Sequence, residues 1–437
     1  MREGYLPYRD SFDHKGPLLY FFNLWGDCLS EECGVLFFEL LSLSVTVFAM
    51  YRIARMFCGI IPSAVSVFVA LSMLFVYYEG GNFTEEYAMP FISVSLLYFL
   101  SYINERAISD WKVVVSGICL GAVLMLRPNM ISVWAVFCIA IMVMQIKDKE
   151  IRELIRFIVL FLLGMIISVL PIFIWLFAKG IFGDFINVYL IFNFMYSDRM
   201  TGNKIVAFFT FFDTSVMILA FLSLIFSVKK HWLNICYMVY LLVTIVFMVM
   251  SGVHYGHYGM VLIPGLVYPF SLLFHNVEMI VDDKARRVVS NLLAIFLLWL
   301  VVISDWMGVV QNIPAIYKDR NSDHLSATMT EVVDIIQELT DENDSISVYG
   351  NWNAVYVLSG RRHATRFSFQ FPIGGIDSSL MDEYWNELQE ELPPVIVITG
   401  GYYHDDIKMF LMNNEYEMIY AENETDPEYG ALIYART

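Results

Sequence analysis

Apolar segments close to 20 residues long recur through the chain from residue 34 to residue 308. A helix needs about 20 predominantly apolar residues to cross the hydrocarbon core of a bilayer. Hydrophobic residues make up 58% of the chain and charged residues 16%, whereas a soluble domain is about a quarter charged. The sequence therefore predicts an α-helical polytopic membrane protein with about ten transmembrane helices. The predicted spans are 34–51, 59–78, 87–103, 112–126, 129–146, 155–178, 205–227, 232–250, 257–275 and 288–308.

Two further apolar runs do not fit a membrane span. The run 17–25 is too short, and the run 182–196 is aromatic and interrupted by polar residues. Segments of this kind lie along the membrane surface, so we expect both to form interfacial helices. Asp213 stands several residues inside the span 205–227, and two interpretations stay open for it. It either faces a water-filled cavity or hydrogen-bonds a neighbouring helix.

The distribution of Lys and Arg predicts which side of the membrane each loop faces, because cytoplasmic loops are enriched in these residues. The loops after the first, third, fifth, seventh and ninth spans carry most of them, and we expect these loops in the cytoplasm. The N-terminal segment, the other loops and the C-terminal tail then lie outside a bacterial cytoplasmic membrane. The expected cytoplasmic cations are Arg52, Arg55, Arg106, Lys112, Lys147, Lys149, Arg152, Arg156, Lys229, Lys230, Lys284, Arg286 and Arg287, and the opposite loops hold Arg127, Lys179, Arg199 and Lys204.

The chain ends in an acidic tail that holds 22 of the 44 acidic residues and 7 of the 27 basic ones. Nucleic acid is a poor partner for such a surface. Helical and strand patterns alternate in the tail, as in a small α/β domain, with helices expected at 326–340 and 405–412 and strands at 345–349, 395–399, 418–421 and 431–435. Three parts are therefore predicted: an extracytoplasmic loop and juxtamembrane helix at 1–33, a transmembrane domain at 34–308, and a soluble extracytoplasmic α/β domain at 309–437.

The stretch YRDSFDHKGPLLYFF, residues 8–22, places two aspartates, a histidine, an arginine and a lysine directly before an apolar run. Ionisable groups beside hydrocarbon are costly and usually have a function. Lys15 is positioned to meet a phosphate at headgroup depth, and Asp10 or Asp13 is a candidate general base. Asp13 and His14 are also candidate ligands of a divalent metal, although two adjacent residues are a weak metal signal. The alternative interpretation is a charged juxtamembrane collar.

The predicted outer loops carry further candidates for substrate binding. Glu85 and Glu86 stand where a span begins, and they either bind substrate or are acidic residues favoured by the helix dipole. Arg127 stands where two spans meet with almost no loop. It either holds an anionic group, such as the donor phosphate, or extends its charge to the membrane surface.

Two clusters complete the set of candidates. Tyrosines at a membrane surface are expected from the aromatic belt alone, whereas two histidines three residues apart are less expected. The first cluster is a candidate for substrate binding, with metal ligation as the weaker alternative; it comprises His254, Tyr255, His257 and Tyr258. The second is the basic patch of the acidic tail, which faces lipid headgroups or an anionic substrate; it comprises Arg361, Arg362, His363 and Arg366.

The sequence contains no P-loop, dinucleotide fingerprint or serine-hydrolase elbow in a supporting context. This argues against a soluble nucleotide as substrate or energy source.

Several motifs together resemble the glycosyltransferase family 39-like group. They are PYRDSFDHKGPLLYFFNLWG, about ten spans, GGNFTEEYAMP, LMLRPN, HYGHYGMVLIP and the tail segment YGNWNAVYVLSGRRHATRFSFQFP. This group consists of membrane enzymes with the GT-C fold and includes protein O-mannosyltransferases and lipid A aminoarabinose transferases. The resemblance extends over essentially the whole chain, and DHKGPL is its most specific part.

The resemblance implies an enzyme that moves a sugar from a polyprenyl-phosphate donor to an extracytoplasmic acceptor, which is a glycan, a lipid or a protein. It implies a contact with the donor phosphate for Lys15 and, in some relatives, a metal contact for the residue at His14. It also implies donor or acceptor contacts for Glu85, Glu86 and Arg127.

The start of the chain departs from the family pattern. Relatives carry another transmembrane helix and an outer loop with the acidic catalytic base before the PYRD segment, and Met1 stands just short of that segment. We therefore expect an upstream portion. The alternatives are that Asp10 or Asp13 serves as the base, or that the chain is an inactive homologue.

Two other functions stay open at this point. A transporter or flippase of lipid-linked sugars would show internal repeats and polar residues at mid-membrane, whereas the charges here lie mainly at the outer edge. A non-catalytic homologue would bind a lipid or a partner without transferring a sugar.

Overall fold

The computed structural model describes the 437-residue chain except for residues 2–3, 31–32, 107, 201, 213, 228–230, 281–282, 302–326, 372, 424–429 and 437. The chain forms two compact units. We call Lys15–Gly183 with Ser197–Gln311 the membrane unit, and Met1–His14 with Asp184–Tyr196 and Asn312–Thr437 the α/β unit. The predicted part boundaries at residues 33 and 309 stay predictions.

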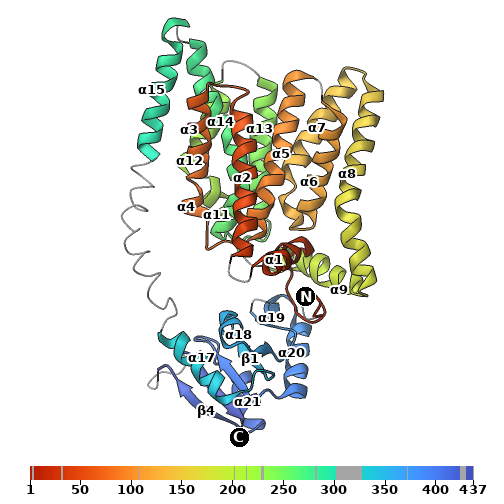
Figure 1. The fold of residues 1–437 in the computed structure, drawn as a ribbon, viewed down its shortest axis with the longest axis vertical. Helices are drawn as coiled ribbons and strands as arrows, with labels where there is room; N and C mark the ends of the chain where they lie inside the picture. Colours follow the sequence, from red (N-terminus) through yellow and green to blue (C-terminus); the bar gives the residue numbers. More distant parts are fainter. Residues whose placement is uncertain are drawn as a thin grey trace. The chain divides into compact units, whose positions relative to one another are not determined.

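The membrane unit is a bundle of helices that stand side by side in Figure 1. The first, α1, begins at Pro17, where the fixed backbone of proline suits the first helical position. The helices are α1 (Pro17–Leu29), α2 (Gly34–Ala54), α3 (Ile60–Leu71), α4 (Leu74–Tyr77), α5 (Thr84–Glu105), α6 (Asp110–Leu124), η1 (Pro128–Met130), α7 (Ser132–Lys147), α8 (Ile151–Ala178), α11 (Lys204–Phe212), α12 (Ser215–Ile225), α13 (His231–Met248), η3 (Gly256–Leu262), α14 (Ile263–Ile280) and α15 (Asp283–Val301).

Every predicted span coincides with one or two helices over most of its described residues, which confirms the polytopic helical fold. Among the residues that the structure describes, five helices are long and apolar enough to cross a membrane, and a sixth span results if the bent pair α11 and α12 counts as one. The remaining spans fall on shorter apolar helices, such as α7, which has 16 residues. Asp213, Lys229, Lys230 and residues 302–308 of the last predicted span lie outside the described residues.

The two runs predicted as interfacial are helical. The first forms α1, and the second forms α9 (Phe182–Phe185), η2 (Ile186–Phe192) and α10 (Asn193–Arg199). Their position at a membrane surface stays a prediction.

Helices α6 and α8 pack closely, because glycines at their interface allow the two backbones to touch. A Cβ atom on Gly117 would lie 2.0 Å from the carbonyl oxygen of Phe161, and one on Gly164 would lie 2.0 Å from that of Val114. Gly121 extends the contact one turn further, next to Ser168. Small residues spaced four apart are a common means of close packing between membrane helices.

We expect Gly164→Leu to lower the free energy of unfolding by about 3 kcal/mol, because the added side chain forces α8 away from α6. Unfolding of the purified protein in detergent micelles measures the change. The matched control is Gly183→Ala, where a Cβ atom meets nothing within 4 Å. Equal stability of the two variants would contradict the close contact.

The α/β unit contains a five-stranded mixed sheet with the strand order β2-β1-β3-β5-β4. Strand β1 pairs in parallel with β2 and β3, whereas β5 runs antiparallel to β3 and β4. The strands are β1 (Ser345–Tyr349), β2 (Arg362–His363), β3 (Val395–Ile398), β4 (Tyr416–Ala421) and β5 (Leu432–Arg436), and the helices are α17 (Ala327–Leu339), α18 (Ala354–Ser359), α19 (Ile373–Ile376), α20 (Ser378–Glu391) and α21 (Asp405–Asn413).

The predicted small α/β domain is thereby confirmed. Its core packs α17 against the sheet through buried aliphatic side chains, among them Val332, Ile336, Ile346, Val397 and Ile433. All six elements expected from the tail sequence are present within a few residues. The short β2 and the helices α18, α19 and α20 were not predicted.

The opening segment of the chain packs into the α/β unit. The backbone N–H of Phe12 donates to the carbonyl of Arg366 at 2.7 Å. The ring of Phe12 stacks on Phe367 and meets the edge of Phe192. These contacts anchor the residues just before Lys15.

Candidate functional site

The first cluster in the membrane unit is centred on Arg127. Because this residue precedes Pro128, its backbone is extended, with φ of −163°, and the chain turns between α6 and α7. The Arg127 guanidinium forms an ion pair with Glu85 Oε1 and lies 4.1 Å above the centre of the Tyr258 ring. The other Glu85 oxygen accepts a hydrogen bond from the Thr84 hydroxyl at 2.8 Å. The Glu85 side chain is 3% exposed and that of Arg127 is 27% exposed, so this is a largely buried ion pair.

Burial alone would lower the pKa of Arg127, but Tyr258 and Glu85 outweigh it and hold the pKa above its ordinary value. Arg127 is therefore a permanent positive charge in this cluster.

The segment that carries Lys15 is hydrogen-bonded to the segment that carries Arg127. The N–H of Gly16 donates to the carbonyl of Leu126 at 3.2 Å. A Cβ atom on Gly16 would lie 2.2 Å from the Met125 oxygen and 2.4 Å from the Leu126 oxygen, so a larger residue does not fit there. Lys15 and Arg127 each stand next to one member of this backbone pair. The structure thus brings together the two segments with the cations predicted to hold a phosphate.

Asp10 lies in a turn of the opening segment, within the α/β unit. Its Oδ2 accepts a hydrogen bond from the Leu6 N–H at 2.6 Å, and its own N–H donates to the Leu6 carbonyl at 2.9 Å. Tyr8 in this turn has φ of +71°. One oxygen of Asp10 is therefore occupied in shaping the turn, and its predicted role as a base stays a prediction.

Asp13 and His14 are partly buried in the α/β unit. The His14 ring stacks on Tyr196, with ring centres 5.6 Å apart, and lies 5.5 Å from Phe192. The Asn193 side chain donates to the His14 carbonyl at 2.7 Å. Within the described ranges, no group of three or more His, Cys, Asp or Glu side chains is placed to hold a metal ion. Two adjacent ligands do not supply the three protein ligands of a catalytic metal site.

The second cluster joins His257 to Glu79, an acid that the sequence analysis did not select. His257 Nδ1 lies 2.6 Å from Glu79 Oε2, and the Gly256 N–H donates to Glu79 Oε1 at 2.9 Å. The ring of His257 stacks on Phe83 with centres 4.1 Å apart. The turn before α5 is thereby fixed to the start of η3.

The residues of the motif HYGHY have different environments. His254 and Tyr255 are exposed, and the Tyr255 ring lies 5.6 Å from that of His257. Tyr258 is buried. The structure therefore brings His257 and Tyr258 into the site and leaves His254 on the surface.

The third cluster holds two carboxylates beside one backbone donor. The N–H of Asn82, a residue with φ of +58°, lies 3.0 Å from Glu86 Oε2 and 2.6 Å from Glu39 Oε1. Glu86 is 6% exposed. Glu39 was not selected from the sequence, because a single acid in the apolar helix α2 gives no sign of which helix it meets. Both carboxylates therefore face the same backbone donor.

The predicted basic patch of the tail is largely engaged within the α/β unit. Arg361 is buried and donates twice to Thr340 at 2.8 Å. Arg366 forms a two-point ion pair with Glu383, at 2.7 and 2.9 Å. Arg362 is exposed. A role of this patch toward lipid or substrate stays a prediction.

The contact between Glu79 and His257 predicts that the free energy of unfolding depends on pH. The hydrogen bond with His257 is the main reason that the pKa of Glu79 is lowered from 4.5. Stability from this contact is fully present above the unfolded pKa and is lost as the pH falls through the lower folded pKa. For a half-exposed contact we expect a loss of about 0.5 kcal/mol. Unfolding of the wild type and Glu79→Gln between about pH 3 and pH 6 measures it, and parallel profiles would contradict it.

Comparisons with known proteins bear on both the fold and the family. The sequence profile of one family, described as the putative competence-induced protein Ccs4 N-terminal domain, matches residues 1–297. No curated protein matches the sequence. The crystal structure of ArnT from Cupriavidus metallidurans in the apo state has a TM-score of 0.61 at 13% identity, and that of ArnT bound to undecaprenyl phosphate has a TM-score of 0.61 at 12% identity. Each alignment covers 98% of this chain and 88% of the ArnT chain.

ArnT is a lipid A aminoarabinose transferase with the GT-C fold, and the fold resemblance inferred from the sequence is thereby confirmed. The protein is an integral membrane protein of this fold. Because the family profile extends over more than half of the chain, the protein belongs to the family of the putative competence-induced protein Ccs4 N-terminal domain.

Proposed function

We propose that this protein is a membrane glycosyltransferase that moves a sugar from a polyprenyl-phosphate donor to an extracytoplasmic glycan, lipid or protein. The observation that carries the proposal is the backbone pair between Gly16 and Leu126, which holds the segments of Lys15 and Arg127 together. Two cations at one end of an apolar bundle suit a phosphate whose hydrocarbon chain lies in the bilayer. The ArnT structure with undecaprenyl phosphate supports the same class of ligand.

The chemistry requires a base, an acceptor and a leaving group. A carboxylate removes the proton from the acceptor hydroxyl or amine, and the acceptor attacks the anomeric carbon of the donor sugar. The bond from this carbon to the phosphate oxygen breaks, and its electron pair stays on the phosphate. Lys15 and Arg127 stabilise the growing negative charge of the leaving phosphate. The candidate bases are Asp10 and Asp13, the two carboxylates that precede Lys15 in the chain.

Glu85 and Tyr258 position Arg127 for this role. A guanidinium has five N–H donors in a fixed plane, so the bond to Glu85 leaves others for a phosphate. The Tyr258 ring beneath the guanidinium restricts its orientation.

Lipid binding and transfer test the proposal in separate steps. Native mass spectrometry of the purified protein is expected to show retained undecaprenyl phosphate and no retained undecaprenol, which has the same chain without the phosphate. Proteoliposomes with a labelled polyprenyl-phosphate sugar are then expected to transfer the label to an envelope acceptor. Equal binding of the two lipids would overturn the phosphate site. Movement of the labelled lipid across the bilayer without transfer would identify a flippase instead.

A further inference from the structure

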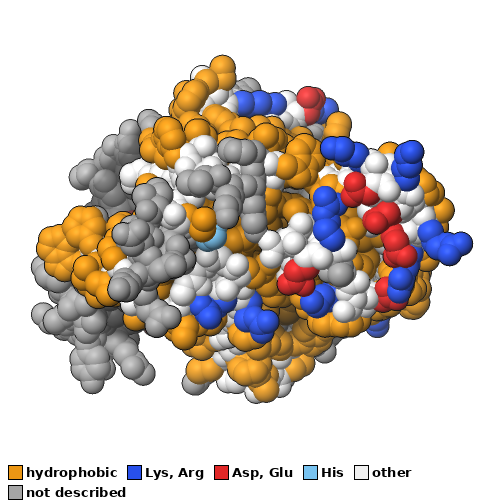
Figure 2. All heavy atoms as spheres, turned by 90° about the horizontal axis from the view of Figure 1, so that it is seen from above, with side chains coloured by type: hydrophobic (Ala, Val, Ile, Leu, Met, Phe, Trp, Pro, Cys, Tyr) orange, Lys and Arg blue, Asp and Glu red, His pale blue; other side chains and the backbone are white. Residues whose placement is uncertain are grey.

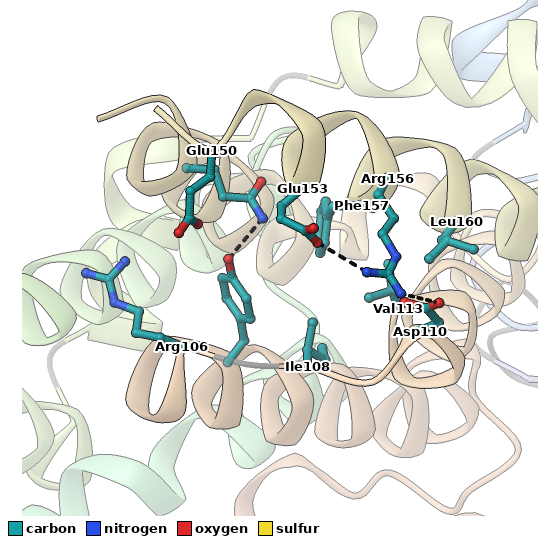
Figure 3. A pocket seen from close by; sticks show the side chains of 11 residues that line it. Arg106, Ile108, Asp110, Val113, Glu150, Glu153, Arg156, Phe157 and Leu160 are labelled. Carbon is teal, nitrogen blue, oxygen red and sulfur yellow. Dashed lines mark hydrogen bonds and ion pairs between the residues drawn. The ribbon is translucent and has the colours of Figure 1, made fainter. Parts of the chain in front are cut away.

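A second site lies at the opposite end of α5 from Glu85. A cavity of about 260 Å³ opens where the loop between α5 and α6 meets the loop between α7 and α8 (Figure 3). The inner part is lined by Tyr102 and Gln145 and by apolar side chains such as Phe157. The charged side chains that line it are Arg106, Asp110, Glu150, Glu153 and Arg156.

Gln145 gives this cavity an unused acceptor. Gln145 is 3% exposed, and its Nε2 donates to the Tyr102 hydroxyl at 2.9 Å. Its Oε1 is buried and accepts no hydrogen bond from the part of the chain that the structure describes. A buried acceptor without a donor is unfavourable, so a molecule that brings an N–H group into the cavity is favoured.

The charges around the opening are of both signs. Arg156 pairs with Asp110 at 2.7 Å and with Glu153 at 3.4 Å, while Arg106 pairs with Asp148 at 3.0 Å. Figure 3 shows Arg106 and Glu150 at one side of the cavity and Arg156 with its two acids at the other. Acidic groups exceed basic ones among the lining residues, which favours a positively charged ligand group near Gln145. The arginines at the rim favour a negatively charged group there.

The acids do not form a metal site, since no three such groups in the described ranges are placed to hold an ion. An organic ammonium group fits better. A primary ammonium has three donors, and it satisfies Gln145 Oε1 and the neighbouring carboxylates at once.

The surroundings favour a lipid as the source of this group. Figure 2 shows charged side chains of both signs gathered on part of this face, bordered by hydrophobic ones. The apolar side chains of Ile155 and Val159 on α8 are exposed, as side chains that face a membrane are. They are next in sequence to the lining residues Arg156 and Leu160. A headgroup in the cavity therefore keeps its acyl chains against apolar surface. The distribution of Lys and Arg predicts this end of the bundle as cytoplasmic.

We propose that this cavity binds the headgroup of an ethanolamine phospholipid. The ammonium donates to Gln145 Oε1 and lies near Glu150 and Glu153, and the phosphate faces the arginines. A choline headgroup has the same charges but no N–H group, so it leaves Gln145 without a donor.

The comparison of ethanolamine and choline lipids with identical acyl chains tests the proposal. Native mass spectrometry of the full chain in detergent with equal amounts of both lipids is expected to show about tenfold more bound ethanolamine lipid. The exposed double variant Glu150→Gln/Glu153→Gln is expected to lose this preference, as is Gln145→Leu. Glu105→Gln is the matched control, because Glu105 is an exposed acid next to Arg106 that does not line the cavity.

Equal binding of the two lipids by the wild type would overturn the proposal, as would a double variant that keeps the full preference. Soluble O-phosphoethanolamine distinguishes the source of the ligand. If it raises the Tm of the wild type but not of the double variant, while the two lipids bind equally, the cavity takes a soluble zwitterion and the lipid proposal is wrong.

Discussion

Replacing Arg127 by methionine is expected to lower the free energy of unfolding by about 3–5 kcal/mol, because it leaves the buried Glu85 carboxylate without its counter-charge. Glu85 is 3% exposed, so water does not replace the lost partner. The same change removes the group above the Tyr258 ring. Denaturant unfolding of the purified protein in micelles, followed by tryptophan fluorescence, measures the effect.

The double variant Arg127→Met/Glu85→Leu separates stability from function. Removing both charges is expected to restore most of the lost stability, because a buried ion pair contributes little over apolar groups of similar volume. Donor binding and sugar transfer are expected to stay lost. Recovery of transfer in the double variant would show that Arg127 has only a structural role.

Replacing Lys15 by alanine is expected to lower the rate of sugar transfer by about 10²–10³-fold, because the leaving phosphate loses a fixed positive charge in the transition state. The fold should persist, since the Gly16 backbone contact does not depend on the Lys15 side chain. The transfer rate in proteoliposomes and the unfolding midpoint are measured on the same preparation.

Lys179→Ala is the control for Lys15→Ala, because Lys179 is an exposed lysine at the end of α8 and belongs to the same predicted face. It is expected to transfer sugar at the wild-type rate. Full activity in Lys15→Ala would overturn the assignment of the phosphate site. Lys15→Arg keeps the charge and is expected to retain part of the activity.

The elements of the fold could be predicted from the sequence because hydrocarbon requires long apolar helices. Each of the ten apolar segments is helical over most of the residues that the structure describes in it. The sequence could not show that α3 and α4 are separate helices or that α11 and α12 meet at 73°, because such breaks depend on packing between helices. In the tail, β2 has only two residues, which is too short for an alternating pattern.

The residues of the site could be predicted from the sequence more readily than the contacts between them. Lys15, Glu85 and Arg127 could be selected because charges beside apolar segments are costly. That Arg127 pairs with Glu85, 42 positions away in the chain, is a long-range contact that no local pattern reveals. For the same reason the roles of Glu39 and Glu79 were missed.

The glycine contact at Gly16 has a consequence for any exchange of parts between this protein and its relatives. Residues 15–18 and the turn between α6 and α7 fit each other backbone to backbone, with no side chain to absorb a mismatch. A chimera that takes residues 14–18 from a relative but keeps residues 125–127 would shift Lys15 and Arg127 relative to each other. The two segments therefore have to be exchanged together, although about a hundred residues of chain separate them.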